Sequence, residues 1–197
     1  MNKDTVTRYF RCMPEIVTPR LLLRSIRKTD YRDMYSYSRD AEVTRYLTWE
    51  PHTCESYTQR YLAYILPKYR SGEFYDWAVI WRESGQMIGT CGFTSLNCEH
   101  NYGEVGYVLH RSFWGKGIAP EALRAIMRVG FMDLNLHRIE SKFIKGNDRS
   151  RRVMEKCGMQ FEGFRRQAMY IKGKYETIGV CSLLASEFIS SQPDIVS

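Results

Sequence analysis

The stretch RSFWGKGIAPEAL at 111–123 constrains the fold most, because it sets two glycines directly before a helical pattern. From Leu123 onward, apolar residues recur at helical spacing. A strand pattern precedes this helix at 102–110, another follows it at 137–144, and a shorter helix is expected at 147–157. The order strand, helix, strand, helix predicts a parallel crossover within one sheet.

The remaining strand patterns predict antiparallel neighbours. They are apolar runs bounded by turn signals, and they lie at 20–26, 75–81, 86–96, 159–171 and 174–188. Helices are expected at 31–40 and 55–70, and Pro67 is expected to kink or end the second of these. We therefore predict an α/β (α+β) fold with a mixed, mostly antiparallel central sheet of about seven strands flanked by helices.

Charge and cysteine content limit the partners and the compartment. Lys and Arg total 29 against 22 acidic residues, and the net charge of +7 favours anionic partners. No block of consecutive Lys and Arg marks a nucleic-acid tail, so nucleic-acid binding is a minority hypothesis and no nucleic-acid partner is predicted. The six cysteines show no paired spacing, and the chain has neither a signal-peptide pattern nor a membrane-span pattern. These features predict free thiols in a cytoplasmic protein without a membrane partner.

The two glycines fit an anion-binding helix start. The first amides of a helix are unpaired and carry partial positive charge, so a phosphate binds there when side chains leave room. Gly115 and Gly117 remove side chains, Ala119 is small, and Pro120 suits a first helical turn. The stretch matches neither a P-loop nor a dinucleotide fingerprint. A flexible turn that uses glycine for positive φ is the alternative interpretation.

Three longer motifs extend this signal. They are EVGYVLHRSFWGKGIAPEAL at 104–123, HRIESKFIKGNDRSRRVMEKCGMQFEGFRR at 137–166 and TPRLLLR at 18–24. Together they resemble the GNAT acetyltransferase superfamily, and within it the RimJ/RimL-type N-terminal acetyltransferases. The resemblance covers residues 16–188 as a GNAT domain, and it leaves an N-terminal extension at 1–15 and a tail at 189–197.

The resemblance implies acetyl-CoA as the acetyl donor, held in a cleft between the fourth and fifth strands. Its diphosphate would lie on the amides of 115–119, and its pantetheine arm would pair with the edge of the strand at 106–108. Trp114 takes the first position of the superfamily's Q/R-x-x-G-x-G/A motif, which removes a polar contact. The implied cofactor-binding residues are Gly106, Tyr107, Val108, Trp114, Gly115, Lys116, Gly117, Ile118, Ala119, Asn147, Ser150 and Arg152.

Two polar residues are the candidate catalytic groups. Glu104 is the candidate general base, acting through water, whereas strand alternation alone would make it a surface carboxylate. Ser150 matches the family's N-x-x-S, which implies a hydroxyl near the CoA sulfur that protonates the thiolate; a polar residue in a first helical turn is the alternative. Asn147 is either a helix cap or a pantetheine contact, and Arg152 either meets the 3′-phosphate or lies on a solvated helix face.

The predicted activity is N-acetyl transfer from acetyl-CoA to a primary amine, by direct transfer within a ternary complex. The acceptor is a protein N-terminus, as the RimJ/RimL resemblance suggests, or a small amine. The alternative is a non-catalytic module that binds an acyl-CoA. The spacing of histidines and cysteines predicts no metal site. The sequence does not determine the oligomeric state, and it is compatible with a homodimer.

Overall fold

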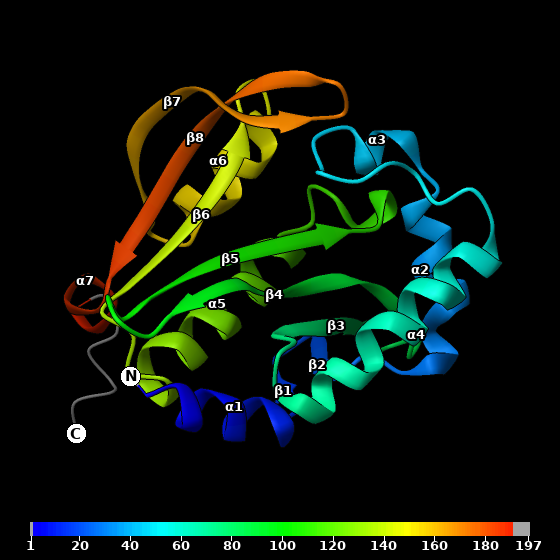
Figure 1. The fold of residues 1–197 in the computed structure, drawn as a ribbon, viewed down its shortest axis with the longest axis horizontal. Coiled ribbons are helices and arrows are strands. Elements are labelled where there is room, and N and C mark those ends of the chain that lie inside the picture. Colours follow the sequence, from blue (N-terminus) through cyan, green and yellow to red (C-terminus); the bar gives the residue numbers. More distant parts are fainter. Residues whose placement is uncertain (1, 191–197) are drawn as a thin grey trace.

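The structure, a computed structural model, describes residues 2–190. Its centre is an eight-stranded sheet with the order β1-β2-β3-β4-β5-β6-β8-β7 (Figure 1). The strands are β1 (Ile16–Val17), β2 (Leu21–Arg24), β3 (Asp76–Trp81), β4 (Met87–Asn97), β5 (Tyr102–Leu109), β6 (Arg138–Ile144), β7 (Gln160–Ile171) and β8 (Lys174–Leu184). Among these strands only the β5–β6 pair is parallel, so the predicted crossover and the mostly antiparallel sheet are confirmed.

The eighth strand is the two-residue β1, which pairs with β2 ahead of the first predicted strand. The predicted fourth and fifth strands are therefore β5 and β6 in this numbering.

Helices cover both faces of the sheet. They are α1 (Lys3–Arg11), α2 (Tyr31–Ser38), α3 (Ala41–Thr44), α4 (Glu55–Ser71), α5 (Ile118–Arg128), α6 (Asp148–Lys156) and α7 (Ala185–Ser190). One core joins α1 and α5 to the first face, where Phe10, Leu123 and Ile126 are fully buried. A second core joins α2 and α4 to the other face, and Met34 and Leu62 lie in it.

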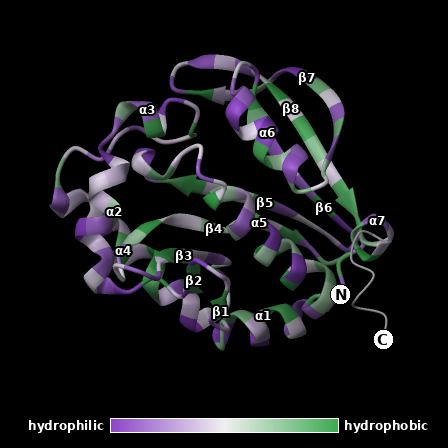
Figure 2. Ribbon diagram, turned by 180° about the vertical axis from the view of Figure 1, so that it is seen from behind, coloured by the Kyte–Doolittle hydropathy of each residue, from purple (hydrophilic) through white to green (hydrophobic). Residues whose placement is uncertain are grey.

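The pleat of β3 explains the two cores. Trp77 and Val79 point toward α1 and α5, whereas Ala78 and Ile80 point toward α2 and α4. All four are buried, as expected for a strand with apolar residues on both faces. Hydrophobic residues mark much of the strands in Figure 2, β8 among them, whereas α2 and α6 carry many hydrophilic residues.

Helix α4 does not end at Pro67. It continues to Ser71, whereas the proline was expected to kink or end the helix. Buried Leu62 and Ile65 precede the proline and buried Tyr69 follows it. Burial of this apolar stripe offsets the backbone hydrogen bond that the proline removes.

The last predicted strand also ends early. It was expected to reach residue 188, but β8 ends at Leu184 and α7 follows. The Glu187 carboxylate accepts a hydrogen bond from the Leu184 amide at 2.9 Å, which favours a helix start there. Phe188 then packs on Phe131, with ring centroids 4.9 Å apart.

The N-terminal segment is packed against the domain. Val6 and Phe10 of α1 lie in the main core, and the Trp77 indole donates a hydrogen bond to the Pro14 carbonyl at 2.9 Å. Residues 191–197 of the predicted tail lie outside the described residues. Within residues 2–190, no helix is both long enough and apolar enough to span a bilayer.

Candidate active site

The sheet splits between β5 and β6. These strands pair only over Tyr102–Val105 of β5; beyond that, β5 follows β4 to Leu109 and β6 follows β8 to Ile144 (Figure 1). The buried Ser141 hydroxyl donates to the Val105 carbonyl at 2.9 Å where the strands diverge. A cleft of about 1480 Å³ opens there. This volume exceeds the range of about 300–1,000 Å³ that is usual for the pocket of one small ligand.

The glycine loop forms one wall of the cleft. Gly115 and Gly117 have φ values of 75° and 74°, in the left-handed region that favours glycine. A Cβ at Gly115 would meet no atom within 4 Å, so the space over the loop is open. In the described part of the chain, the amides of 115–119 donate no hydrogen bond to a protein acceptor. The loop therefore suits an anion bound by main-chain amides. Its two glycines also adopt positive φ, as the alternative interpretation expects.

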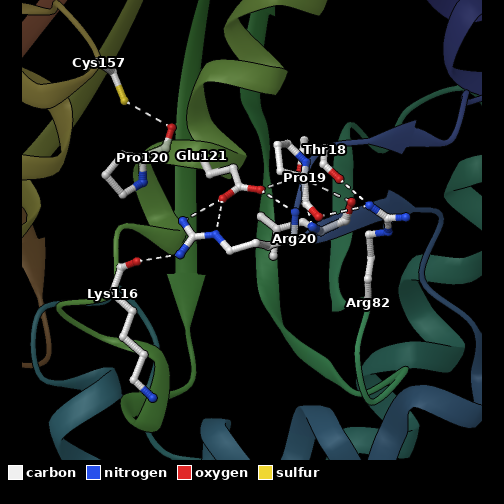
Figure 3. A network of polar contacts seen from close by, with 9 residues as sticks. Thr18, Pro19, Arg20, Arg82, Lys116, Pro120, Glu121 and Cys157 are labelled. Carbon is white, nitrogen blue, oxygen red and sulfur yellow. Dashed lines mark hydrogen bonds and ion pairs between the residues drawn. The ribbon is translucent and has the colours of Figure 1, made fainter.

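Arg20, which directly precedes β2, contacts this loop (Figure 3). The Arg20 guanidinium donates to the Lys116 carbonyl at 2.9 Å and forms an ion pair with Glu121 at 2.7 Å. Thr18 also donates to the Glu121 carboxylate, at 2.6 Å. Burial would raise the pKa of Glu121, but the hydrogen bonds from Thr18 and Arg20 outweigh it and lower that pKa. Arg20 thus neutralises a carboxylate that would otherwise repel an anion at the start of α5.

Arg20 has no predicted role from the sequence, although TPRLLLR at 18–24 contains it. Its partners lie about a hundred residues away in the chain, so only the folded structure reveals the contact.

Tyr107 and Ser150 meet on the α5 side of the split. The Tyr107 hydroxyl lies 2.9 Å from the Ser150 Oγ and donates to the Ser150 carbonyl at the same distance. Burial raises the pKa of Tyr107, so the phenol keeps its proton at neutral pH. Asn147 caps α6 through a hydrogen bond from the Ser150 amide at 3.3 Å. Structure thus brings together Tyr107, Asn147 and Ser150 as a linked polar group.

Glu104 lies on β5 with a basic partner. The Lys142 Nζ donates to the Glu104 carboxylate at 2.6 Å, and both side chains are about one quarter exposed. Burial would lower the pKa of Lys142, but the hydrogen bond and charge of Glu104 outweigh it and raise that pKa. The Glu104 carboxylate is therefore neutralised within the cleft wall.

The other predicted cofactor-binding residues occupy different places. Arg152 lines the cleft and is exposed. Trp114 also lines it, donates its indole N–H to the Leu109 carbonyl at 2.8 Å, and carries the Arg149 guanidinium over its ring at 5.1 Å. Lys116 is the one predicted residue outside the lining; its side chain lies over the Phe113 ring.

The far end of the cleft contains a carboxylate that sequence analysis missed. Asp76 begins β3 and lines the cleft beside Tyr37 of α2 and Tyr61 of α4. Burial raises the pKa of Asp76 to about 7, although hydrogen bonds from the Thr90 side chain and the Trp77 amide act to lower it. In sequence, Asp76 is one polar residue at a strand start, and only its position opposite two glycines on neighbouring strands could have marked it.

The β7–β8 turn bridges this end. The Lys172 ammonium donates to the Thr44 carbonyl at 2.7 Å and lies 3.7 Å from the Glu50 carboxylate. In Figure 1 the β7–β8 turn accordingly lies near α3. Ile144, Ile171 and Ile178 pack beneath it.

Residues 2–190 contain no group of three or more His, Cys, Asp or Glu side chains that could hold a metal ion. Burial raises the pKa of Cys157 to about 11 and the pKa of Cys91 well above its ordinary value. Neither thiol is therefore a ready nucleophile.

Comparisons with known proteins point in one direction. A family model described as an acetyltransferase (GNAT) domain matches residues 20–160. The uncharacterized N-acetyltransferase p20 of Bacillus licheniformis is 34% identical over 176 residues, which are 89% of this chain and 99% of that protein. A GNAT-family acetyltransferase structure from Bacillus anthracis has a TM-score of 0.78 at 26% identity, over 88% of this chain and 99% of its own. The fold is also that of the ribosomal α-N-protein acetyltransferase RimL, solved in complex with coenzyme A, with a TM-score of 0.73 at 22% identity over 86% and 96% of the two chains.

Proposed function

The chain belongs to the GNAT acetyltransferase family, and on that premise we propose that it transfers the acetyl group of acetyl-CoA to a primary amine. The observation that carries the proposal is the split between β5 and β6. One wall of the cleft at this split carries the unpaired main-chain amides of 115–119, and the other wall carries carboxylates. An anionic acyl carrier fits the first wall, and a cationic amine fits the second.

The donor site is proposed at the glycine loop and the free edge of β5. The amides of 115–119 would hold the diphosphate, because they are unpaired and Gly115 leaves open space above them. Gly106, Tyr107 and Val108 pair with β4 on one side only, so their other edge can pair with the pantetheine amides. Bound acetyl-CoA supplies the activated acyl group. Arg152 remains the proposed contact of the 3′-phosphate.

Ser150 is the proposed proton donor to the departing thiolate. Its hydroxyl lies 2.9 Å from the protonated Tyr107 phenol, so a proton given up by Ser150 can be replaced from Tyr107. Asn147 supports this placement, because its side chain fixes the first turn of α6. A contact of Asn147 with the pantetheine stays part of the proposal.

Glu104 stays a candidate general base, with one condition that the structure adds. The Glu104 carboxylate already accepts a hydrogen bond from the Lys142 ammonium at 2.6 Å, so one of its oxygens is occupied. Proton transfer to Glu104 therefore requires the Lys142 contact to loosen, or a water between Glu104 and the amine.

The acceptor is a primary amine on a protein N-terminus or a small molecule. The fold shared with RimL, named as a ribosomal α-N-protein acetyltransferase, supports the N-terminus. The volume of the cleft, about 1480 Å³, supports a second substrate beside the donor.

Thiol release from labelled acetyl-CoA, with a panel of amines that includes peptides beginning with Ala or Ser, tests this function. We expect amine-dependent thiol release and a labelled amide product. Calorimetric CoA binding without turnover would instead identify a non-catalytic acyl-CoA-binding module. Absence of CoA binding, together with nucleic-acid affinity that falls steeply with salt, would overturn the assignment.

A further inference from the structure

Two glycines on neighbouring strands lie between Asp76 and the split that separates β5 from β6. Asp76 pairs with Gly92, and Gly92 pairs with Gly106, so the three residues form one row over β3, β4 and β5. Directly opposed residues point to the same face, here the face of α2 and α4. With strands about 4.8 Å apart, the backbones of Asp76 and Gly106 are about 10 Å apart. The carboxylate shortens that gap, because its Oδ1 lies 2.8 Å from the place of a Cβ on Gly92.

The Tyr69 hydroxyl holds the backbone of Asp76 in place. The Tyr69 hydroxyl donates to the Asp76 carbonyl at 2.5 Å and accepts a hydrogen bond from the Ile26 amide at 3.2 Å. The side chain is half-buried and hydrogen-bonded to Thr90, and it forms no ion pair within residues 2–190. Glu104, on the same face, is already paired with Lys142. Of Asp76 and Glu104, only Asp76 lacks a basic partner within residues 2–190, and it lines the cleft.

The titratable neighbours of Asp76 are neutral at pH 7. Tyr37 faces it from α2, Tyr61 and Tyr69 face it from α4, and Cys91 lies behind it on β4. Burial, with the charge of Asp76, raises the pKa of each, and that of Tyr61 reaches about 12. The charged pair of Glu104 and Lys142 lies farther along β5 and β6. His52 lies against Tyr61, with ring centroids 6.0 Å apart, and burial lowers its pKa. Asp76 is therefore the group of this cluster whose pKa is raised toward neutrality.

We propose that Asp76 binds the ammonium of the acceptor and takes its proton before acetyl transfer, an inference that rests on the proposed acetyltransferase function. The ammonium gives one proton to the Asp76 carboxylate and becomes a neutral amine. The amine nitrogen then bonds to the thioester carbonyl carbon, and the carbon–sulfur bond breaks. The second proton of the nitrogen leaves to the thiolate through Ser150, and Asp76 releases its own proton to water.

The same geometry describes the acceptor. One carboxylate flanked by two phenol rings, Tyr37 and Tyr61, matches one ammonium on an apolar or aromatic carbon frame. A peptide N-terminus whose first side chain is small or apolar meets this description, and so does an arylalkylamine.

The test compares the pH dependence of kcat/KM in variants that remove one carboxylate at a time. The assay is thiol release from acetyl-CoA with peptides that begin with Ala or Ser and with phenethylamine. We expect the wild-type profile to rise through pH 7, and Asp76→Asn to lose about 100-fold at pH 7 together with that rise. CoA affinity, measured by calorimetry, should stay within about twofold because Asp76 lies outside the donor site.

Two further carboxylate variants serve as controls. Glu104→Gln should keep the rise near pH 7. Asp33→Asn should keep both the rise and the rate, because Asp33 is half-buried on the same side of the sheet but accepts the Met87 amide outside the cleft. An Asp76→Asn enzyme that retains the rise, or a Glu104→Gln enzyme that loses it, overturns the proposal while acetyl transfer stands. A wild-type chain that binds CoA without turnover overturns both.

Thr90→Val covers the case in which Asp76→Asn fails to fold. The Thr90 hydrogen bond lowers the pKa of Asp76, so its loss should move the rise in kcat/KM upward by about half a pH unit and leave the plateau rate in place. A lower plateau with an unmoved midpoint would contradict a proton-accepting role for Asp76.

Discussion

The wall of the cleft that we propose binds the donor, here the donor wall, and the wall that we propose binds the acceptor, here the acceptor wall, are built in different ways. The donor wall comes from one stretch, 106–119, with α6 beside it, and its proposed recognition groups are main-chain amides. The acceptor wall takes Tyr37 from α2, Tyr61 from α4 and Asp76 from β3. Main-chain recognition requires positions without side chains, which leaves glycines close together in the sequence, here Gly115 and Gly117. Side-chain recognition requires convergence of distant segments, which leaves no local pattern.

The largest effect should follow a side chain placed in the donor wall. Gly115→Val should lower CoA affinity at least 100-fold, about 2.7 kcal/mol in binding free energy, because the branched side chain fills the space over the amides. Calorimetry with CoA measures it.

Gly85→Val is the matched control for this substitution. Gly85 has φ 72° against 75° at Gly115, and a Cβ at either would meet no atom within 4 Å. Both variants should lose about 1–2 kcal/mol of stability from the strained backbone, and only Gly115→Val should lose CoA. Equal CoA affinity in the two variants would remove the glycine loop from the donor site.

A smaller effect on turnover is expected at the junction of the two walls. Ser150→Ala should lower kcat about 30-fold with little change in CoA affinity, because the thiolate loses its proton donor. Pre-steady-state and steady-state thiol release measure it. Tyr107→Phe, which leaves the Ser150 hydroxyl in place, should cost less, and a larger loss in Tyr107→Phe would assign the proton to the phenol.

The arginine behind the donor wall should contribute about tenfold. Arg20→Met removes the contact to Lys116 and leaves the Glu121 charge uncompensated, so CoA affinity should fall about tenfold. Adding Glu121→Gln should restore part of it. Arg82→Met is the control, since Arg82 holds Thr18 and Pro19 without touching Lys116 or Glu121 (Figure 3). An unchanged affinity in Arg20→Met would show that the loop holds its shape unaided.

The smallest effect is expected at the bridge over the acceptor wall. Lys172→Met should raise the acceptor KM about threefold and leave CoA affinity unchanged, because it removes the contact to the Thr44 carbonyl. Lys174→Met is the matched control on the same turn, where Lys174 is largely exposed and pairs with Glu176. A change in CoA affinity rather than in KM would mean that the two walls are not independent.

The contrast between the walls also explains what could be predicted from sequence. The crossover and the cap at Asn147 follow from local patterns, and the GNAT fold follows from the resemblance of the motifs to that superfamily; all three are confirmed. The continuation of α4 to Ser71 and the helix at 185–190 were not predicted, because burial of distant residues decides them.

The candidate site divides in the same way. The glycine loop could be proposed from its own residues, whereas Arg20, Lys142 and Asp76 could not, because each depends on partners from other elements. The roles of Glu104 and Ser150 remain predictions that the experiments above address.

The narrow seam between β5 and β6 also bears on how the chain folds. These strands share four residue pairs, whereas β6 and β8 share seven and β4 and β5 share eight. Local opening should therefore separate β6–β8 from the rest of the sheet before either part melts, and amide hydrogen exchange should resolve two cooperative units. A molecule that spans the seam would fasten the units together and slow exchange in both.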